Sequence, residues 1–141
     1  MTFIREEAAM ADTQPPDETH RSPQSLTAQI SNQIVQTMRE YTGRGPTQAR
    51  TYLNDNVVLC IVKDTLTKGE QALVAGGEEQ SVLDLRRRYQ SLMREDASKA
   101  IEGITGRRVV TFMSDNATDP DIAAEIFLLD GPPERAPLAA V

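Results

Sequence analysis

Four arginines beside a repeated Thr-Gly-Arg triplet are the side chains of this sequence best suited to bind a ligand. The triplet occurs at residues 42–44 and again at residues 105–107. Guanidinium groups bind phosphates and carboxylates through two parallel hydrogen bonds, so converging arginines would form a site for a small anion or an acidic partner. The candidate contact residues are Arg44, Arg50, Arg107 and Arg108.

The segment "YTGRGPTQARTYLNDN", residues 41–56, has the glycine, proline and arginine content of a phosphate-binding loop. Its Gly43 follows a helical pattern, however, and the C-terminal end of a helix exposes carbonyl groups that disfavour anions. Phosphate sites use the N-terminal end, where backbone N–H groups point outward, and the glycine spacing matches neither the Walker A nor the Rossmann motif. We therefore interpret Gly43 as a helix C-cap residue, with Pro46 preventing the helix from continuing.

The side chains that usually carry catalysis are scarce. The only histidine, His20, lies in the polar N-terminal segment, so a Ser-His-Asp or Cys-His mechanism has no base within the expected domain. The only cysteine, Cys60, stands in the middle of "VVLCIV" and is interpreted as an apolar core residue. We predict that the protein is not an enzyme, and we expect no catalytic residue and no cofactor.

Metal binding is not predicted either. Zinc sites need clusters of cysteine and histidine, which the sequence lacks. The acidic stretch "SDNATDPD", residues 114–121, offers the oxygen ligands that calcium and magnesium prefer, but Ala117 and Pro120 break the spacing of an EF-hand loop. We interpret this stretch as a solvated hairpin loop and expect no metal ion.

Two further charged features are interpreted as parts of the surface. "LRRRYQSLMRE" places Arg86–Arg88 and Arg94 on a long helix among acidic residues, which is typical of a solvated helix face. Contact with a small anion or an acidic partner is the alternative. Glu125 stands inside the apolar segment "IAAEIFLLD". Either it faces solvent on an edge strand, or it pairs with Arg108 across a hairpin.

The formal net charge of -6 argues against a general nucleic-acid or anionic-membrane binder, because such proteins need a basic surface. A single cysteine cannot form an internal disulfide, which suits a reducing compartment. The N-terminal "MTFIREEAAM" has acidic residues where a signal peptide would be apolar, and the aliphatic run "VVLCIV" is far shorter than the roughly 20 residues of a membrane span. We expect a cytoplasmic protein that associates with a membrane only through a partner.

Hydrophobic spacing and turn residues predict the element order α-β-β-α-α-β-β. Helices are expected over residues 26–42, 67–75 and 79–105, and β-hairpins over residues 49–64 and 107–130. The run "VVLCIV" should form a central strand, because it is apolar on both faces. Short hairpin connections imply antiparallel pairing. We therefore predict an α+β fold with a four-stranded antiparallel sheet and helices packed on one face.

The domain is predicted to span residues 25–130. Residues 1–24 form a polar extension and residues 131–141 a proline-rich tail, and we expect both to be disordered or flexible. The long helix, at about 1.5 Å per residue, exceeds what a compact domain of this size needs, so it either supports a subunit interface or breaks near "EDASK".

The sequence also indicates an internal repeat. "RTYLNDN" (50–56) aligns with "VTFMSDN" (110–116), and each stretch follows a helix and a Thr-Gly-Arg triplet. This predicts an α-β-β duplication in which each unit covers part of one sheet and the two units complete one core.

The stretch from about residue 26 to residue 130 resembles a family of small bacterial proteins named for MpsC, a component of a Na+-translocating, membrane-potential-generating system. The resemblance rests on "ISNQIVQTMREYTGRGPTQARTYLNDNVVLCIVKDTLTKGEQALV" and on "ITGRRVVTFMSDNATDPDIAAEIFLLD", in which the order of helix, TGRGP, hairpin and "LT-x-x-E" is kept. It implies an accessory protein associated with a membrane ion or bicarbonate transport system. It transfers no catalytic residue to this sequence.

Two functions are predicted from these observations. The first is a non-enzymatic accessory or regulatory interaction module, expected to be a homodimer, that docks on a protein partner such as a membrane transporter subunit without inserting into the membrane. The alternative is a small-anion or nucleotide-sensing domain whose junction arginines converge through the pseudo-symmetry of the two units. Nucleic acid is not an expected partner, because the chain is acidic and has few aromatic residues to stack on bases.

Overall fold

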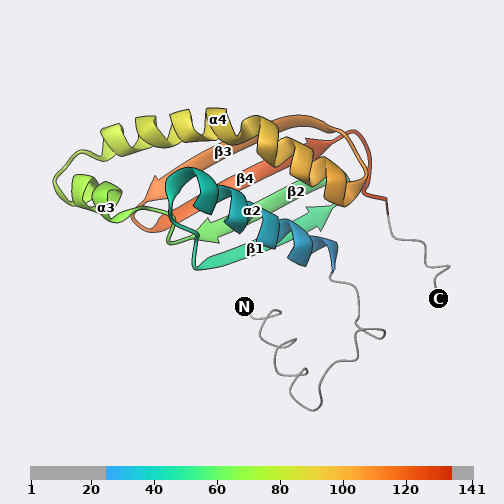
Figure 1. The fold of residues 1–141 in the computed structure, drawn as a ribbon, viewed down its shortest axis with the longest axis horizontal. Coiled ribbons are helices and arrows are strands. Elements are labelled where there is room, and N and C mark those ends of the chain that lie inside the picture. Colours follow the sequence, from blue (N-terminus) through green and yellow to red (C-terminus); the bar gives the residue numbers. More distant parts are fainter. Residues whose placement is uncertain (1–24, 135–141) are drawn as a thin grey trace, which may run out of the picture.

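The computed structural model describes residues 25–134, which form one antiparallel sheet with helices on one of its faces (Figure 1). The strands lie in the order β1-β2-β4-β3, and every neighbouring pair is antiparallel. The elements along the chain are α2 (Leu26–Thr42), β1 (Gln48–Asn54), β2 (Val57–Lys63), α3 (Lys68–Ala75), α4 (Glu79–Thr105), β3 (Val109–Thr118) and β4 (Asp121–Leu129). The predicted fold class and element order are confirmed.

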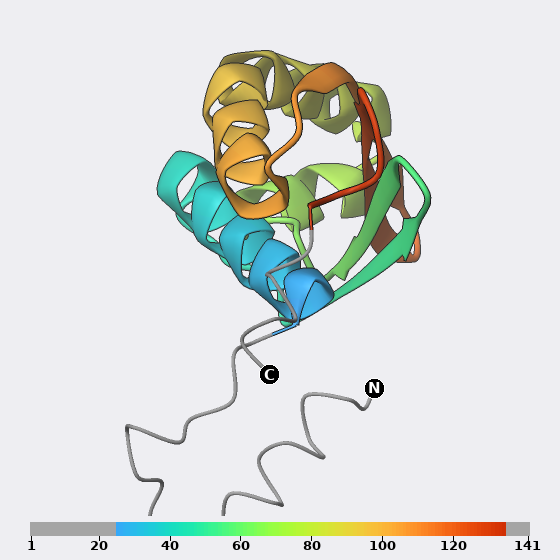
Figure 2. The ribbon, with the colours of Figure 1, turned by 90° about the vertical axis from the view of Figure 1, so that its right-hand side faces the viewer.

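The core lies between the sheet and the two long helices. Helix α2 packs against β1 and β2, while α4 packs against α2 and β3. Figure 2 shows the helices together on one side of the sheet. The strand β2 is central, as the aliphatic run predicted. The core is apolar and is built by Ile30, Ile34, Met38, Val58, Cys60, Val62, Met93, Ala97, Ile101, Phe112, Ala123, Phe127 and Leu129.

Both long helices end at their Thr-Gly-Arg triplets in the same way. Gly43 and Gly106 take the left-handed conformation, with φ of 80° and 70°, and close the helices as C-cap residues. In each triplet the threonine Oγ1 donates to the carbonyl four residues earlier at 2.8 Å and accepts from the arginine N–H at 3.2 Å. The predicted capping role of Gly43 is confirmed, and each triplet serves as a helix stop.

We expect Gly43→Ala to lower the free energy of unfolding by about 1 kcal/mol, because a residue with a Cβ is strained in the left-handed region. Gly103→Ala is the matched control. That position is inside α4, and an added Cβ would meet no atom within 4 Å. Alanine there should raise stability by about 0.5–1 kcal/mol. Urea denaturation of both variants measures the two effects, and equal changes would contradict the capping role.

Helix α4 runs unbroken over 27 residues, through the "EDASK" stretch where a break was considered. The helix α3 begins with the capping box that Thr67 and Glu70 indicate: the Thr67 side chain accepts from the Glu70 N–H at 3.1 Å, and the Glu70 carboxylate accepts from the Thr67 N–H at 2.8 Å. This short helix packs against α4.

The acidic stretch "SDNATDPD" is not the loop that was predicted. Residues 114–118 belong to the edge strand β3, and the turn contains only Asp119 and Pro120. Asp121 is the first residue of β4, and its carboxylate accepts hydrogen bonds from the Thr65 and Leu66 N–H groups at 3.0 Å. The pairing of β3 with β4 extended the hairpin into residues whose polar character indicated a turn.

The residue alignment proposed for the internal repeat is also wrong in detail. Tyr52 is 46 % exposed on one face of the sheet, whereas its aligned partner Phe112 is buried on the other. Asp55 and Asn56 form the β1–β2 turn, whereas Asp115 and Asn116 lie within a strand. The strand order does relate the two hairpins by an approximate two-fold axis between β2 and β4. A duplication of the two α-β-β units therefore stays a prediction, supported by topology and by the triplets.

The predicted N-terminal extension and residues 135–141 of the predicted tail lie outside the described residues. The first four residues of that tail are described and contact the domain. The Glu134 N–H donates to the Thr105 carbonyl at 2.9 Å, and the Arg107 Nε donates to the Pro132 carbonyl. The described part of the tail therefore packs against the C-terminal end of α4.

Candidate functional site

A row of polar side chains crosses the helix-facing side of the sheet, in the middle of the apolar core. The strand register places Thr51 beside Cys60, Cys60 beside Glu125, and Glu125 beside Ser114, one from each strand. At the β1 end, the Thr51 and Ser31 hydroxyl groups are 2.7 Å apart and buried. This row contains two ionisable groups, Cys60 and Glu125.

Glu125 is the central residue of the row, and it is only 1 % exposed. The Ser114 hydroxyl donates to its Oε2 at 2.7 Å. Burial raises the pKa of the Glu125 carboxyl to about 7, while the Ser114 hydrogen bond and the positive charge of Arg86 act in the opposite direction. Glu125 therefore exchanges a proton near neutral pH from inside the core. It neither faces solvent nor pairs with Arg108, so both sequence-based interpretations were wrong.

Arg86 projects from α4 into the same interface and is only 2 % exposed. Its Nη1 lies 3.3 Å from the Glu70 Oε1 and 3.3 Å from the Thr65 carbonyl oxygen. The second oxygen of Glu70 is buried without a hydrogen-bond partner in the described part of the chain. Arg86 was predicted on a solvated helix face, and that interpretation is wrong. It forms a buried ion pair that ties α3 to α4.

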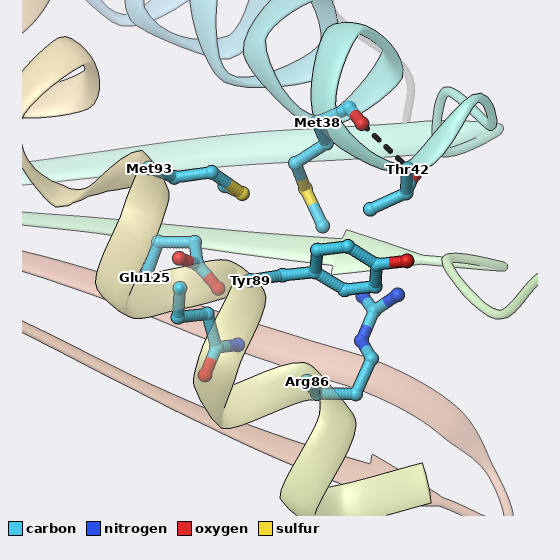
Figure 3. A pocket seen from close by; sticks show the side chains of 7 residues that line it. Met38, Thr42, Arg86, Tyr89, Met93 and Glu125 are labelled. Atoms are coloured by element: carbon cyan, nitrogen blue, oxygen red, sulfur yellow. Dashed lines mark hydrogen bonds between the residues drawn. The ribbon is translucent and has the colours of Figure 1, made fainter.

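A small pocket lies between α2, α4 and β4, beside these charges. Figure 3 shows Met38 and Thr42 from α2, Arg86, Tyr89 and Met93 from α4, and Glu125 from β4 around it. Its empty volume of about 210 Å³ includes space open to solvent, below the roughly 300–1,000 Å³ of ordinary small-molecule sites. An organic substrate would not fit in this pocket without rearrangement.

Cys60 lies next to Glu125 and is fully buried. Burial raises the pKa of its thiol to about 12, a hydrogen bond with Thr51 opposes this shift, and the nearby Glu125 carboxyl adds to it. A thiol with such a pKa carries almost no thiolate at neutral pH, so it is a poor nucleophile. The predicted core role of Cys60 is confirmed. Within residues 25–134, no group of three or more His, Cys, Asp or Glu side chains is placed to hold a metal ion.

Three of the four arginines predicted as a contact site lie at two opposite ends of the sheet. The Arg44 Nε donates to the Asp64 carbonyl at 3.0 Å, near the end of β2. Arg107 and Arg108 precede β3, and Arg108 pairs with Asp130 at 3.9 Å. Because β1 and β3 run in opposite directions, a seven-residue strand, about 23 Å long, separates Arg44 from this pair. One small anion cannot contact all of them, so the structure does not bring the predicted site together.

Arg50 lies apart from the other three, on the face of the sheet that no described helix covers. Its guanidinium group lies 5.2 Å from the centre of the Tyr52 ring, an exposed cation–π contact. The same face carries two neighbouring rows of mostly apolar side chains across the four strands. We call this surface the open face and define it by Tyr52, Val57, Leu59, Met113, Ile126 and Leu128.

The open face is unusual because it exposes large apolar side chains beside exposed polar residues such as Arg50 and Asp115. Tyr52, Val57 and Met113 are 46 %, 36 % and 51 % exposed, and the central residues between them are half-buried. A sheet face that remained in water would carry polar side chains at alternate positions. Figure 2 shows the strands on the side away from the helices, with no described element over them. Exposed apolar surfaces of this kind occur where proteins contact other proteins, membranes or ligands.

Comparison with known proteins identifies a family for this chain. No curated protein and no solved structure matches the chain. No described helix is long and apolar enough to cross a membrane. The model of one family, described as the Na+-translocating membrane potential-generating system (MpsC), matches residues 22–131, which include all the elements described above. The chain therefore belongs to the MpsC family.

Proposed function

We propose that the protein is a non-enzymatic accessory module of a Na+-translocating, membrane-potential-generating system, and that it acts by binding other protein chains through its open face. The observation that carries this proposal is the exposed apolar side of the sheet, represented by Tyr52 and Met113. Large apolar side chains on a solvated surface favour burial against a partner, by about 25 cal/mol for each Å² removed from water.

The family description supports the biological setting, because it names a system that generates a membrane potential. A member with no described membrane-spanning helix would act there through contacts with other subunits. Glu125 and Cys60 are weak candidates for catalysis, since both lie in the core and the described pocket beside Glu125 is below substrate size. The anion-sensing alternative stays a prediction, and the separation of Arg44 from Arg107 removes the shared site on which it depended.

We expect deletion of the gene to lower the Na+-dependent part of the membrane potential, and the wild-type gene to restore it. Met113→Lys should not restore it, because a lysine would place a charge in the open face without disturbing the core. The measurement is the signal of a potential-sensitive dye in sodium medium, compared with choline medium.

The matched control for this experiment is Leu92→Lys on α4. Leu92 is 66 % exposed on a helix surface away from the sheet, so its replacement adds the same charge elsewhere. This variant should restore the potential as wild type does. An unchanged potential in the deletion strain, or full restoration by Met113→Lys, would contradict the proposed function.

A further inference from the structure

We propose that the partner on the open face is a second copy of this chain, bound face to face around a two-fold axis that runs along the strands between β2 and β4. This inference deepens the proposed function and depends on the same surface. It is carried by the pattern of apolar and charged side chains across the four strands, which is complementary to itself under this symmetry.

The apolar row at the centre of the face is the first part of the argument. The register aligns Tyr52, Leu59, Ile126 and Met113 across β1, β2, β4 and β3. A two-fold axis along the strands exchanges the two edge strands and the two central strands. Tyr52 then lies over the partner's Met113, and Leu59 lies over the partner's Ile126. Aromatic and aliphatic side chains interdigitate well in stacked sheets, which lie about 10 Å apart.

The charged row beside it is the second part. This row contains Arg50 on β1, Ile61 on β2, Ala124 on β4 and Asp115 on β3. The face is therefore basic at one edge and acidic at the other. The same rotation places Arg50 over the partner's Asp115 and Asp115 over the partner's Arg50, so two ion pairs form at the rim.

Within the described part of the chain, neither charge has an ionic partner. Among residues 25–134, no ion pair includes Arg50 or Asp115. Arg50 contacts the Tyr52 ring, and the Asp115 carboxylate accepts from the neighbouring Asn116 N–H at 2.9 Å. Both side chains are exposed at the two edges of the open face and are available to a second copy.

The size of the face fits a reversible dimer. Four strands about 4.8 Å apart and about 23 Å long give a flat footprint of roughly 450 Å² on each copy. The two footprints together approach the roughly 1,000 Å² at which specific interfaces begin, and the side chains add to the flat area. We expect dissociation at micromolar concentrations rather than a permanent dimer.

The test uses residues 1–141 and measures the dimer dissociation constant by analytical ultracentrifugation, over about 1 µM to 1 mM protein. Arg50→Glu and Asp115→Arg each bring like charges together twice in the dimer, and each should weaken it about tenfold or more. The double variant with both changes restores opposite charges and should bind within about threefold of wild type. Met113→Lys should weaken the dimer by at least about tenfold, because it places a charge in the apolar row.

All of these positions are exposed, so the variants should remain folded, and circular dichroism checks this. Leu92→Lys is the control and should leave the dissociation constant unchanged. A monomer at every concentration would overturn the inference, as would a dimer that resists all three open-face changes or that responds to Leu92→Lys. If the chain is monomeric but Met113→Lys still fails to restore the membrane potential, the open face binds a different protein, and the proposed function stands without this inference.

Discussion

Replacing Arg86 with leucine is expected to lower the free energy of unfolding by about 3–5 kcal/mol, because it leaves the Glu70 carboxylate buried without its cation. Both side chains are almost completely buried, at 2 % and 3 % exposed. The Thr65 carbonyl loses a hydrogen bond from Arg86 in the same change. Domains of this size have a total free energy of unfolding of about 5–15 kcal/mol. The expected loss is therefore a large part of the stability of the protein.

The neighbouring arginine provides a matched control. Arg87 pairs with Asp84 at the same distance of 3.3 Å, but its side chain is 67 % exposed. Water screens such a pair, so Arg87→Leu should change stability by less than about 1 kcal/mol. Urea denaturation of both variants compares the same chemical change in the core and at the surface. Equal losses of stability in the two variants would show that burial does not strengthen the contribution of Arg86.

A double-mutant cycle identifies the source of the loss. Glu70→Gln keeps the capping box, because glutamine can accept from the Thr67 N–H as glutamate does. When combined with Arg86→Leu, it removes the unpaired charge. We expect the double variant to be more stable than the sum of the two single changes by about 1–3 kcal/mol. Additive effects would contradict a coupled pair. If Arg86→Leu does not fold, then Glu70→Gln and Arg86→Lys test the same ion pair, because each should lower the free energy of unfolding by a smaller amount.

The element order and the sheet could be predicted because they depend on local patterns. The helix stops at Gly43 and Gly106, the apolar run around Cys60 and the capping box at Thr67 are each contained in a few neighbouring residues. Turns, caps and periodicity fix such features without reference to distant parts of the chain. Residues 114–121 were the exception. Their polar sequence indicated a loop, but residues 114–118 pair with β4 as part of β3.

The buried charges could not be predicted, because the sequence does not show which face of an element is covered. In β4 the inward residues include Ala123, Glu125 and Phe127, but the outward set, with Ile126 and Leu128, is more apolar. Alternation therefore did not identify the face on which Glu125 lies.

Helix α4 has the same ambiguity. Leu85 and Leu92 are exposed, whereas Arg86 and Gln90 lie on the buried stripe with Met93. The partners of the buried charges come from other elements, so only tertiary structure brings them together.

This ambiguity bears on function. A sheet with one covered face normally shows its orientation through polar residues on the other face. Here the open face keeps apolar residues such as Tyr52 and Met113, so both faces of the sheet carry apolar side chains. The candidate arginines were selected by their sequence position beside the triplets. Only Arg50 lies on the open face, through its place in β1.

Replacing Glu125 with glutamine is expected to make the protein more stable at pH 8, relative to wild type, by up to about 3 kcal/mol. Burial raises the pKa of this carboxyl from 4.5 to about 7. The folded protein therefore binds more protons than the unfolded chain between these pH values, and this group contributes stability at low pH that is lost as the pH rises through about 7. Glutamine is neutral at every pH and can still bond with the Ser114 hydroxyl.

The measurement is the free energy of unfolding by urea at pH 5 and at pH 8 for both proteins. The advantage of Glu125→Gln over wild type should grow between the two pH values, because only wild type must ionise a buried carboxyl. Glu95→Gln is the control, since Glu95 is 78 % exposed and pairs with Lys99 at the surface. Its difference from wild type should change by less than about 1 kcal/mol between pH 5 and pH 8. If Glu125→Gln behaves like Glu95→Gln, then the folded protein accommodates the charged Glu125 carboxylate without losing stability, which would contradict the expected cost of its burial.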